Sequence, residues 1–102
     1  MSDLNPKQLF DLTGKLAIVT GASRGLGQYF ARALAGAGAD LVITSRTLAS
    51  LEPFRRELEA LGRRVLPHEL DVTEFESIQS MMAEAFQAFG KIDVLVNNAG
   101  CN

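Results

Sequence analysis

Two kinds of sequence segment alternate along most of this chain, and their alternation limits the folds that it can adopt. Short runs rich in β-branched and other apolar residues are separated by longer stretches in which apolar residues recur with a helical period. The short runs are Leu16–Thr20, Leu41–Thr44, Val65–Leu66 and Ile92–Val96. Strands that alternate with helices at this spacing favour right-handed crossovers and a parallel sheet. We therefore predict an α/β fold in the order β-α-β-α-β-α-β.

Signals for helix ends support this order. The first helix is expected over residues 25–37. The second is expected to begin after Ser50 as N-cap, which places Pro53 in the first turn, where backbone N–H groups have no helical partner. The third carries a capping box, with Thr73 as the N-cap and Glu76 three residues later. A glycine follows the end of each predicted helix: Gly38, Gly62 and Gly90.

Each predicted helix also has apolar residues at helical spacing, which would form its buried face. In the first helix these residues are Phe30, Ala33, Leu34 and Ala37. In the second they are Leu51, Phe54, Leu58 and Leu61. In the third they are Phe75, Ile78, Met82, Ala85, Phe86 and Phe89. We expect these faces to cover the sheet.

Composition restricts the class of protein. The chain has 102 residues, of which 47% are hydrophobic and 22% charged, as is typical of one compact globular domain. A formal net charge of −2 and the lack of a long basic run argue against nucleic-acid binding. Neither a membrane span nor a signal peptide is recognisable, so we expect a cytoplasmic protein. His68 is the only histidine and Cys101 the only cysteine, so no metal site is predicted.

The sharpest local feature is a glycine-rich turn between the first predicted strand and the first predicted helix. Residues 20–27 read Thr-Gly-Ala-Ser-Arg-Gly-Leu-Gly. Gly21 would permit the tight turn, Gly25 would let the backbone approach a pyrophosphate, and Gly27 would let helix and strand pack closely. The helix N-terminus would offer unpaired N–H groups to the phosphates. This context indicates dinucleotide binding rather than a P-loop or a purely structural turn.

Three motifs together resemble those of the short-chain dehydrogenase/reductase family. The turn matches the family signature Thr-Gly-x-x-x-Gly-x-Gly, Asp71 follows the third strand, and residues 97–100 read Asn-Asn-Ala-Gly after the fourth strand. The resemblance implies a Rossmann-type parallel sheet with helices on both faces and strand order 3-2-1-4. It also implies a dinucleotide-binding Rossmann domain, residues 15–102, truncated at its C-terminal side. Residues 1–14 are polar and irregular, with the breakers Pro6 and Gly14, and are expected to form a surface lead-in.

The resemblance assigns roles to individual residues. Thr20 and the turn would hold the pyrophosphate and the first ribose, and the turn residues concerned are Gly21, Ser23, Arg24, Gly25, Leu26 and Gly27. Asp71 would accept a hydrogen bond from the adenine amino group, with Val72 beside the ring. The cofactor between adenosine and nicotinamide would be lined by Asn98, Ala99 and Gly100.

Charge at the end of the second predicted strand bears on the choice of cofactor. NAD-binding enzymes place a carboxylate there for the ribose 2′-hydroxyl, whereas Ser45 stands at that position here. Arg46 could pair with a 2′-phosphate through two hydrogen bonds, and Arg24 is a second cation near the same group. We therefore predict a preference for NADP(H) over NAD(H).

The resemblance implies an NAD(P)-dependent oxidoreductase, which would be a homo-oligomer at full length and would act on a small molecule. In this family, catalysis requires a Ser and a Tyr-x-x-x-Lys, but Tyr29 is followed four residues later by Ala33. We therefore expect a fragment that is inactive alone. The lead-in Leu9–Lys15 and the turn are similar to gluconate 5-dehydrogenases and to 3-oxoacyl reductases. The alternative is a non-catalytic NADP(H)-binding module.

Overall fold

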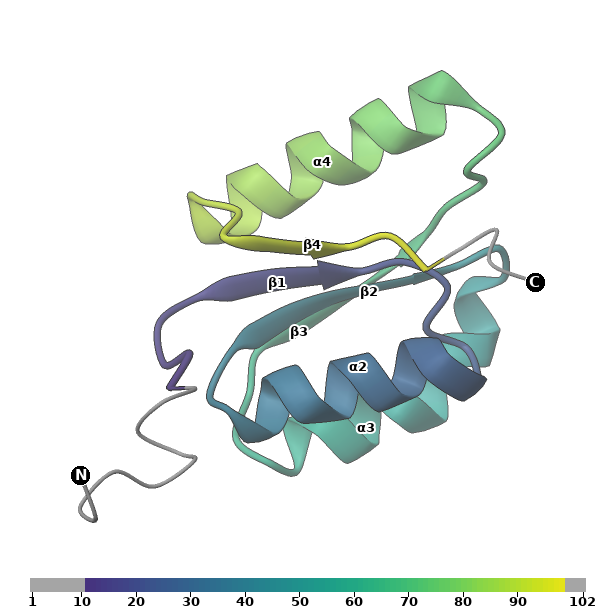
Figure 1. Ribbon diagram of the computed structural model, residues 1–102. Helices are drawn as coiled ribbons and strands as arrows, with labels where there is room; N and C mark the ends of the chain where they lie inside the picture. Colours follow the sequence, from purple (N-terminus) through teal and green to yellow (C-terminus); the bar gives the residue numbers. More distant parts are fainter. Residues whose placement is uncertain (1–10, 99–102) are drawn as a thin grey trace, which may run out of the picture.

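The strands form one parallel sheet. The computed structural model describes residues 11–98. Its strands are β1 (Leu16–Val19), β2 (Asp40–Ser45), β3 (Val65–Glu69) and β4 (Val94–Val96). They lie in the order β3-β2-β1-β4, and each neighbouring pair is parallel (Figure 1). The predicted parallel sheet and the strand order 3-2-1-4 are confirmed.

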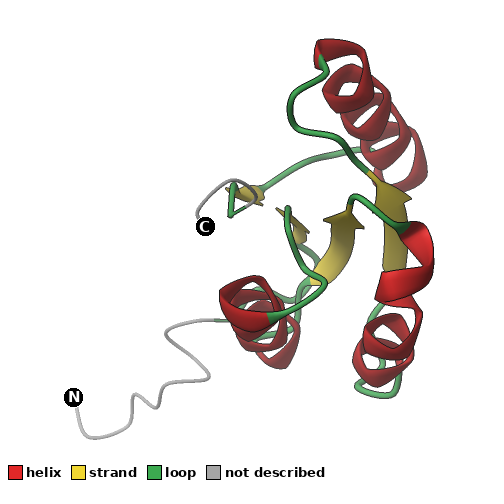
Figure 2. Cartoon of the chain, turned by 90° about the vertical axis from the view of Figure 1, so that its right-hand side faces the viewer, coloured by secondary structure: helices red, strands yellow, loops and turns green. Residues whose placement is uncertain are grey.

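Helices cover both faces of this sheet, as predicted. They are α2 (Gly25–Gly36), the short 3-10 helix η1 (Leu48–Leu51), α3 (Glu52–Glu59) and α4 (Phe75–Phe89). The helices α2 and α3 lie on one face and α4 lies on the other (Figure 1, Figure 2). Within residues 11–98, no helix combines the length and the hydrophobicity that a bilayer span requires.

The sheet separates two hydrophobic clusters. Because side chains alternate along a strand, Ala17 and Val19 of β1 point toward α2 and α3, whereas Leu16 and Ile18 point toward α4. All four side chains are fully buried. A strand that is buried on both faces needs apolar residues at every position. This explains the unbroken apolar run that marks β1 in the sequence.

The two predicted N-caps are wrong. Ser50 lies within η1, where its hydroxyl donates to the backbone oxygen of Thr47 at 2.6 Å. The N-cap of α4 is Glu74, and the hydroxyl of Thr73 donates to the side chain of Asp71. In both loops, the hydroxyl binds a nearby acceptor before the helix, a known alternative to capping.

Two strands differ in extent from the apolar runs that mark them in the sequence. β3 continues through Pro67 to Glu69, and a proline is tolerated there because β3 lies at the edge of the sheet. β4 begins at Val94, two residues later than predicted. Asp93 precedes it and binds β1 twice, because its side chain accepts from the Leu16 N–H at 2.8 Å and its N–H donates to the Leu16 oxygen at 3.0 Å.

α4 packs on the sheet through a narrower strip than the sequence predicts. Met81 and Ala85 are buried, whereas Phe75 and Phe86 are 71% and 59% exposed. Successive helical residues advance by about 100°, so both phenylalanines lie at one margin of the strip centred on Met81 and Ala85. Leu95 of β4, on the same face of the sheet, is 53% exposed. α4 therefore packs against residues of β1, β2 and β3 but leaves Leu95 of β4 half exposed.

Two other residues of the predicted buried faces are exposed. Ala33 of α2 faces solvent, and the residues buried in that helix are Gly27, Ala31 and Ala35. These small residues let α2 lie close to the sheet. Leu61 is 50% exposed because α3 ends at Glu59, before it.

Candidate functional site

A cleft of about 700 Å³ opens at the carboxyl ends of the strands. Open α/β sheets bind ligands at this edge, where the strand order reverses, which here is between β1 and β4. The cleft is lined by Gly21, Ser23, Arg24, Gly25, Leu26, Thr44, Ser45, Arg46, Thr47, Ser50, Leu70, Asp71, Val72, Thr73 and Asn98. Among residues 11–98, no group of three His, Cys, Asp or Glu side chains could hold a metal ion.

Most predicted site residues with a described position line this cleft. The exceptions are Thr20 and Gly27, which belong to the glycine-rich turn and hold it against neighbouring backbone. Ala99 and Gly100 lie outside the described residues, as does most of the lead-in. The sequence motifs, which are scattered over almost 80 positions, therefore converge on one place.

The glycine-rich turn shapes one wall of the cleft. Gly21 and Gly25 have φ values of 66° and 58°, in the left-handed region that side chains other than glycine rarely adopt. The N–H of Ala22 donates to the backbone oxygen of Thr44 at 2.8 Å and fixes the turn to β2. α2 then begins at Gly25 behind the N-cap Arg24, whose side chain makes no capping hydrogen bond. The first N–H groups of α2 therefore remain available to an anion.

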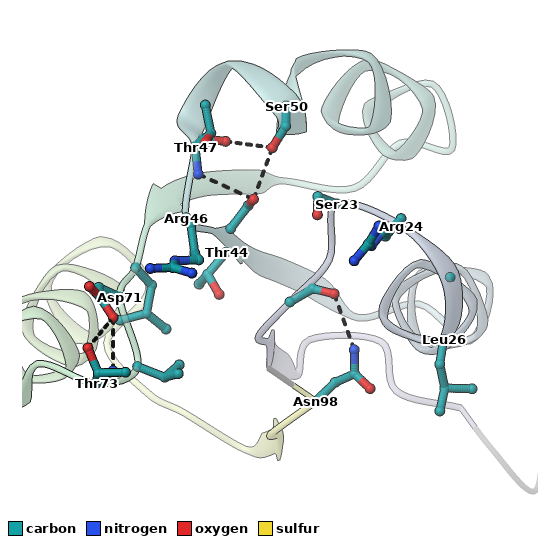
Figure 3. A pocket seen from close by; sticks show the side chains of 15 residues that line it. Ser23, Arg24, Leu26, Thr44, Arg46, Thr47, Ser50, Asp71, Thr73 and Asn98 are labelled. Atoms are coloured by element: carbon teal, nitrogen blue, oxygen red, sulfur yellow. Dashed lines mark hydrogen bonds between the residues drawn. The ribbon is translucent and has the colours of Figure 1, made fainter. Parts of the chain in front are cut away.

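Asn98 connects this turn to the end of β4. Its backbone N–H donates to the Thr20 hydroxyl at 2.9 Å, and its side-chain Nδ2 donates to the Gly21 oxygen at 3.2 Å (Figure 3). The N–H of Thr20 donates to the Val96 oxygen at 3.0 Å. The Asn-Asn-Ala-Gly motif thus braces the glycine-rich turn through at least its second residue.

At the end of β2, a short chain of hydroxyl groups fixes Ser45. Because Ser50 donates its only proton to the Thr47 oxygen at 2.6 Å, Ser45 must be the donor in the 2.9 Å bond between the Ser45 and Ser50 hydroxyls. Ser45 Oγ also accepts from the Thr47 N–H at 3.4 Å. The Ser45 side chain is uncharged and buried, and its hydroxyl can only accept a hydrogen bond from a further group.

Two arginines enter the cleft from different elements. Arg24 comes from the start of α2 and Arg46 follows β2, and both side chains are exposed. Arg46 extends toward Asp71 (Figure 3). Cations on two sides of one cleft concentrate anions there.

Asp71 is held rigidly at the opposite wall. Its Oδ1 accepts from the N–H of Thr73 at 3.0 Å and from the hydroxyl of Thr73 at 2.6 Å. Its own N–H donates to the hydroxyl of Ser77 at 3.1 Å. The Thr73 bonds lower the pKa of the Asp71 carboxyl below its ordinary value, and the charge of Arg46 adds to this effect. Asp71 is therefore a carboxylate at neutral pH.

The cleft also contains residues that the sequence analysis did not assign to a site: Thr44, Thr47, Ser50, Leu70 and Thr73. Thr44 is notable because its hydroxyl is buried and has no hydrogen-bond partner within residues 11–98. No motif marks these residues. Their only signal is adjacency, since each lies within five positions of the predicted Ser45, Arg46 or Asp71.

Two curated proteins are similar to this chain in sequence. 2-Dehydro-3-deoxy-D-gluconate 5-dehydrogenase of Bacillus subtilis (strain 168) is 47% identical over 91 residues, which are 89% of this chain and 35% of that protein. Gluconate 5-dehydrogenase of Gluconobacter oxydans (strain 621H) is 40% identical over 92 residues, which are 90% of this chain and 36% of that protein. The chain thus spans about a third of the length of these curated relatives.

Two solved structures have a fold similar to that of this chain. A metagenomic short-chain oxidoreductase in complex with NADP superposes with a TM-score of 0.84 at 41% identity, covering 88% of this chain and 41% of that one. Hydroxysteroid dehydrogenase from Escherichia coli gives a TM-score of 0.87 at 33% identity, covering 94% of this chain and 40% of that one. The model of the family described as short chain dehydrogenase matches residues 15–102. The chain belongs to the short-chain dehydrogenase/reductase family.

Proposed function

We propose that the chain binds NADP(H) as the cofactor-binding part of an oxidoreductase that transfers hydride between NADP(H) and an alcohol or ketone. The observation that carries the proposal is the end of β2, where a neutral Ser45 and a cationic Arg46 lie in the same cleft as Arg24. A carboxylate at Ser45 would repel a 2′-phosphate, whereas arginine binds phosphate through paired hydrogen bonds. The related oxidoreductase solved with NADP supports this choice.

The residues present fit such a cofactor. The left-handed Gly21 and Gly25 leave room for a pyrophosphate at the N-terminus of α2. The hydroxyl of Thr44, which has no hydrogen-bond partner in the described part of the chain, is a buried polar group of the kind that a ligand or a water satisfies. Asp71 would face the adenine amino group with Val72 beside the ring. When bound, the nicotinamide ring supplies or accepts the hydride.

For the whole protein we propose a sugar-acid or 3-oxoacyl substrate, a homo-oligomeric state and a cytoplasmic location. The substrate proposal is supported by the relatives that are named as gluconate-type dehydrogenases. Tyr29 is an unsuitable acid/base for this reaction, because it is 66% exposed on α2 and is not among the residues that line the cleft.

Arg46→Ala is expected to reduce the affinity for NADPH while changing the affinity for NADH little. A hydrogen bond to a charged group contributes about 1.5–3 kcal/mol, so the ratio of the two affinities should fall by roughly 10- to 100-fold. Calorimetric titration of the chain with each cofactor measures this ratio.

Arg56→Ala is the matched control, because Arg56 is an exposed arginine of α3 outside the cleft. It should leave both affinities unchanged. An unaltered NADPH-to-NADH ratio in Arg46→Ala would refute the role of Arg46 in cofactor choice. Failure of the unmodified chain to bind either cofactor would refute the proposed function itself.

A further inference from the structure

Thr73 is the residue that orients the carboxylate of Asp71. Both of the side-chain hydrogen bonds that Asp71 accepts within residues 11–98 come from Thr73, and both end on the same oxygen, Oδ1. The backbone around Asp71 is fixed as well, because its N–H donates to Ser77 Oγ and its oxygen accepts from the Glu74 N–H at 3.1 Å. The carboxylate can therefore rotate only by breaking the Thr73 bonds.

The two carboxylate oxygens of Asp71 therefore have different surroundings. Oδ1 is used by Thr73, so Oδ2 is the oxygen that is left for a ligand in the cleft. Figure 3 shows Thr73 and Asp71 joined in this way at one wall of the cleft, with Arg46 alongside. A carboxylate that is held in one rotamer loses less conformational freedom when it binds, and it accepts a hydrogen bond in only one direction.

We propose that Thr73 is a positioning residue for base recognition, which fixes Asp71 so that Oδ2 accepts a hydrogen bond from the exocyclic amino group of adenine. This inference rests on the proposed function. It assigns discrimination between a 6-amino and a 6-oxo purine to the pair Thr73–Asp71. A 6-oxo group has no proton to donate, so the bond from the 6-position is lost and the oxo oxygen repels the carboxylate.

The test compares NADPH with its deamino analogue, in which hypoxanthine replaces adenine. We expect the unmodified chain to bind NADPH about tenfold more tightly than the analogue, as is usual for one hydrogen bond to a charged group. Thr73→Val removes the hydroxyl at nearly constant shape and should reduce this ratio several-fold. Thr73→Ser keeps a hydroxyl and should restore it, whereas Asp71→Asn should abolish it. Thermal melts establish that each variant is folded, and Thr73→Ala replaces Thr73→Val if the valine is not tolerated.

The outcomes separate the inference from the proposed function. If Thr73→Val weakens binding of both compounds equally, or leaves both unchanged, Thr73 does not position the base-binding group and the inference is wrong. If the unmodified chain binds both compounds equally well, Asp71 does not read adenine and the inference fails, while NADP(H) binding stands. If the unmodified chain binds neither compound, the proposed function fails as well.

Discussion

Gly27→Ala is expected to abolish dinucleotide binding and to destabilise the fold more than any other single-methyl change in the site. A Cβ at Gly27 would lie 2.0 Å from the Gly21 oxygen, 2.8 Å from its carbonyl carbon and 2.9 Å from Asn98 Nδ2. Two of these atoms belong to the backbone and cannot rotate away. Overpacking that side chains can absorb costs about 1–3 kcal/mol, so a clash with fixed backbone should cost ~3 kcal/mol or more. Urea unfolding and titration with NADPH measure the two effects.

Gly36→Ala provides the control within the same helix. A Cβ at Gly36 would meet no atom within 4 Å, and Gly36 is not among the described glycines with positive φ. Alanine should therefore stabilise α2 by about 0.5–1 kcal/mol and leave binding intact. If Gly27→Ala instead matched Gly36→Ala in stability and affinity, the close contact between α2 and the turn would have no energetic importance.

Ser45→Asp is expected to reverse the preference for NADPH over NADH. Like charges in contact cost several kcal/mol, so the affinity for NADPH should fall by roughly 100-fold or more. The new carboxylate would accept hydrogen bonds from the ribose hydroxyls of NADH, whose affinity should rise. Titration of the variant with both cofactors gives the two changes directly.

Ser45→Asn separates charge from structure. Asparagine is close to aspartate in size and similarly disturbs the hydroxyl chain that runs from Ser45 through Ser50 to the backbone oxygen of Thr47, but it carries no charge. It should weaken NADPH binding far less than Ser45→Asp. Equal losses in the two variants would show that the hydroxyl chain matters and that the charge at the end of β2 does not.

Those parts of the structure that local chemistry decides could be predicted from the sequence. The left-handed glycines of the turn, the parallel order of the strands and the approach of Asp71 and Asn98 to the same edge follow from short motifs and from the handedness of crossovers. Each of these features depends on residues that are close in sequence or on a rule that holds for nearly all parallel sheets.

Other features depend on competition between similar energies. The free energy of a hydroxyl that caps a helix and that of one that binds a neighbouring loop differ by only about 1 kcal/mol. The sequence pattern therefore wrongly predicts Ser50 and Thr73 as N-caps. Periodicity shows that α4 has an apolar face but not which part of a broad face touches the sheet, so the exposure of Phe75 and Phe86 was not foreseen. The burial of the Thr44 hydroxyl without a hydrogen-bond partner among residues 11–98 depends on tertiary packing and has no local signature.

The bonds between Asn98 and the glycine turn also concern the order in which this protein is made. The backbone bond from Asn98 to Thr20 spans 78 positions, and the side-chain bond to Gly21 spans 77. On the ribosome, the glycine turn therefore emerges long before the residue that braces it. A nascent chain that has β1 and α2 but lacks β4 and Asn98 has the glycine turn without these two bonds. The turn can gain these two bonds only after Asn98 has left the exit tunnel.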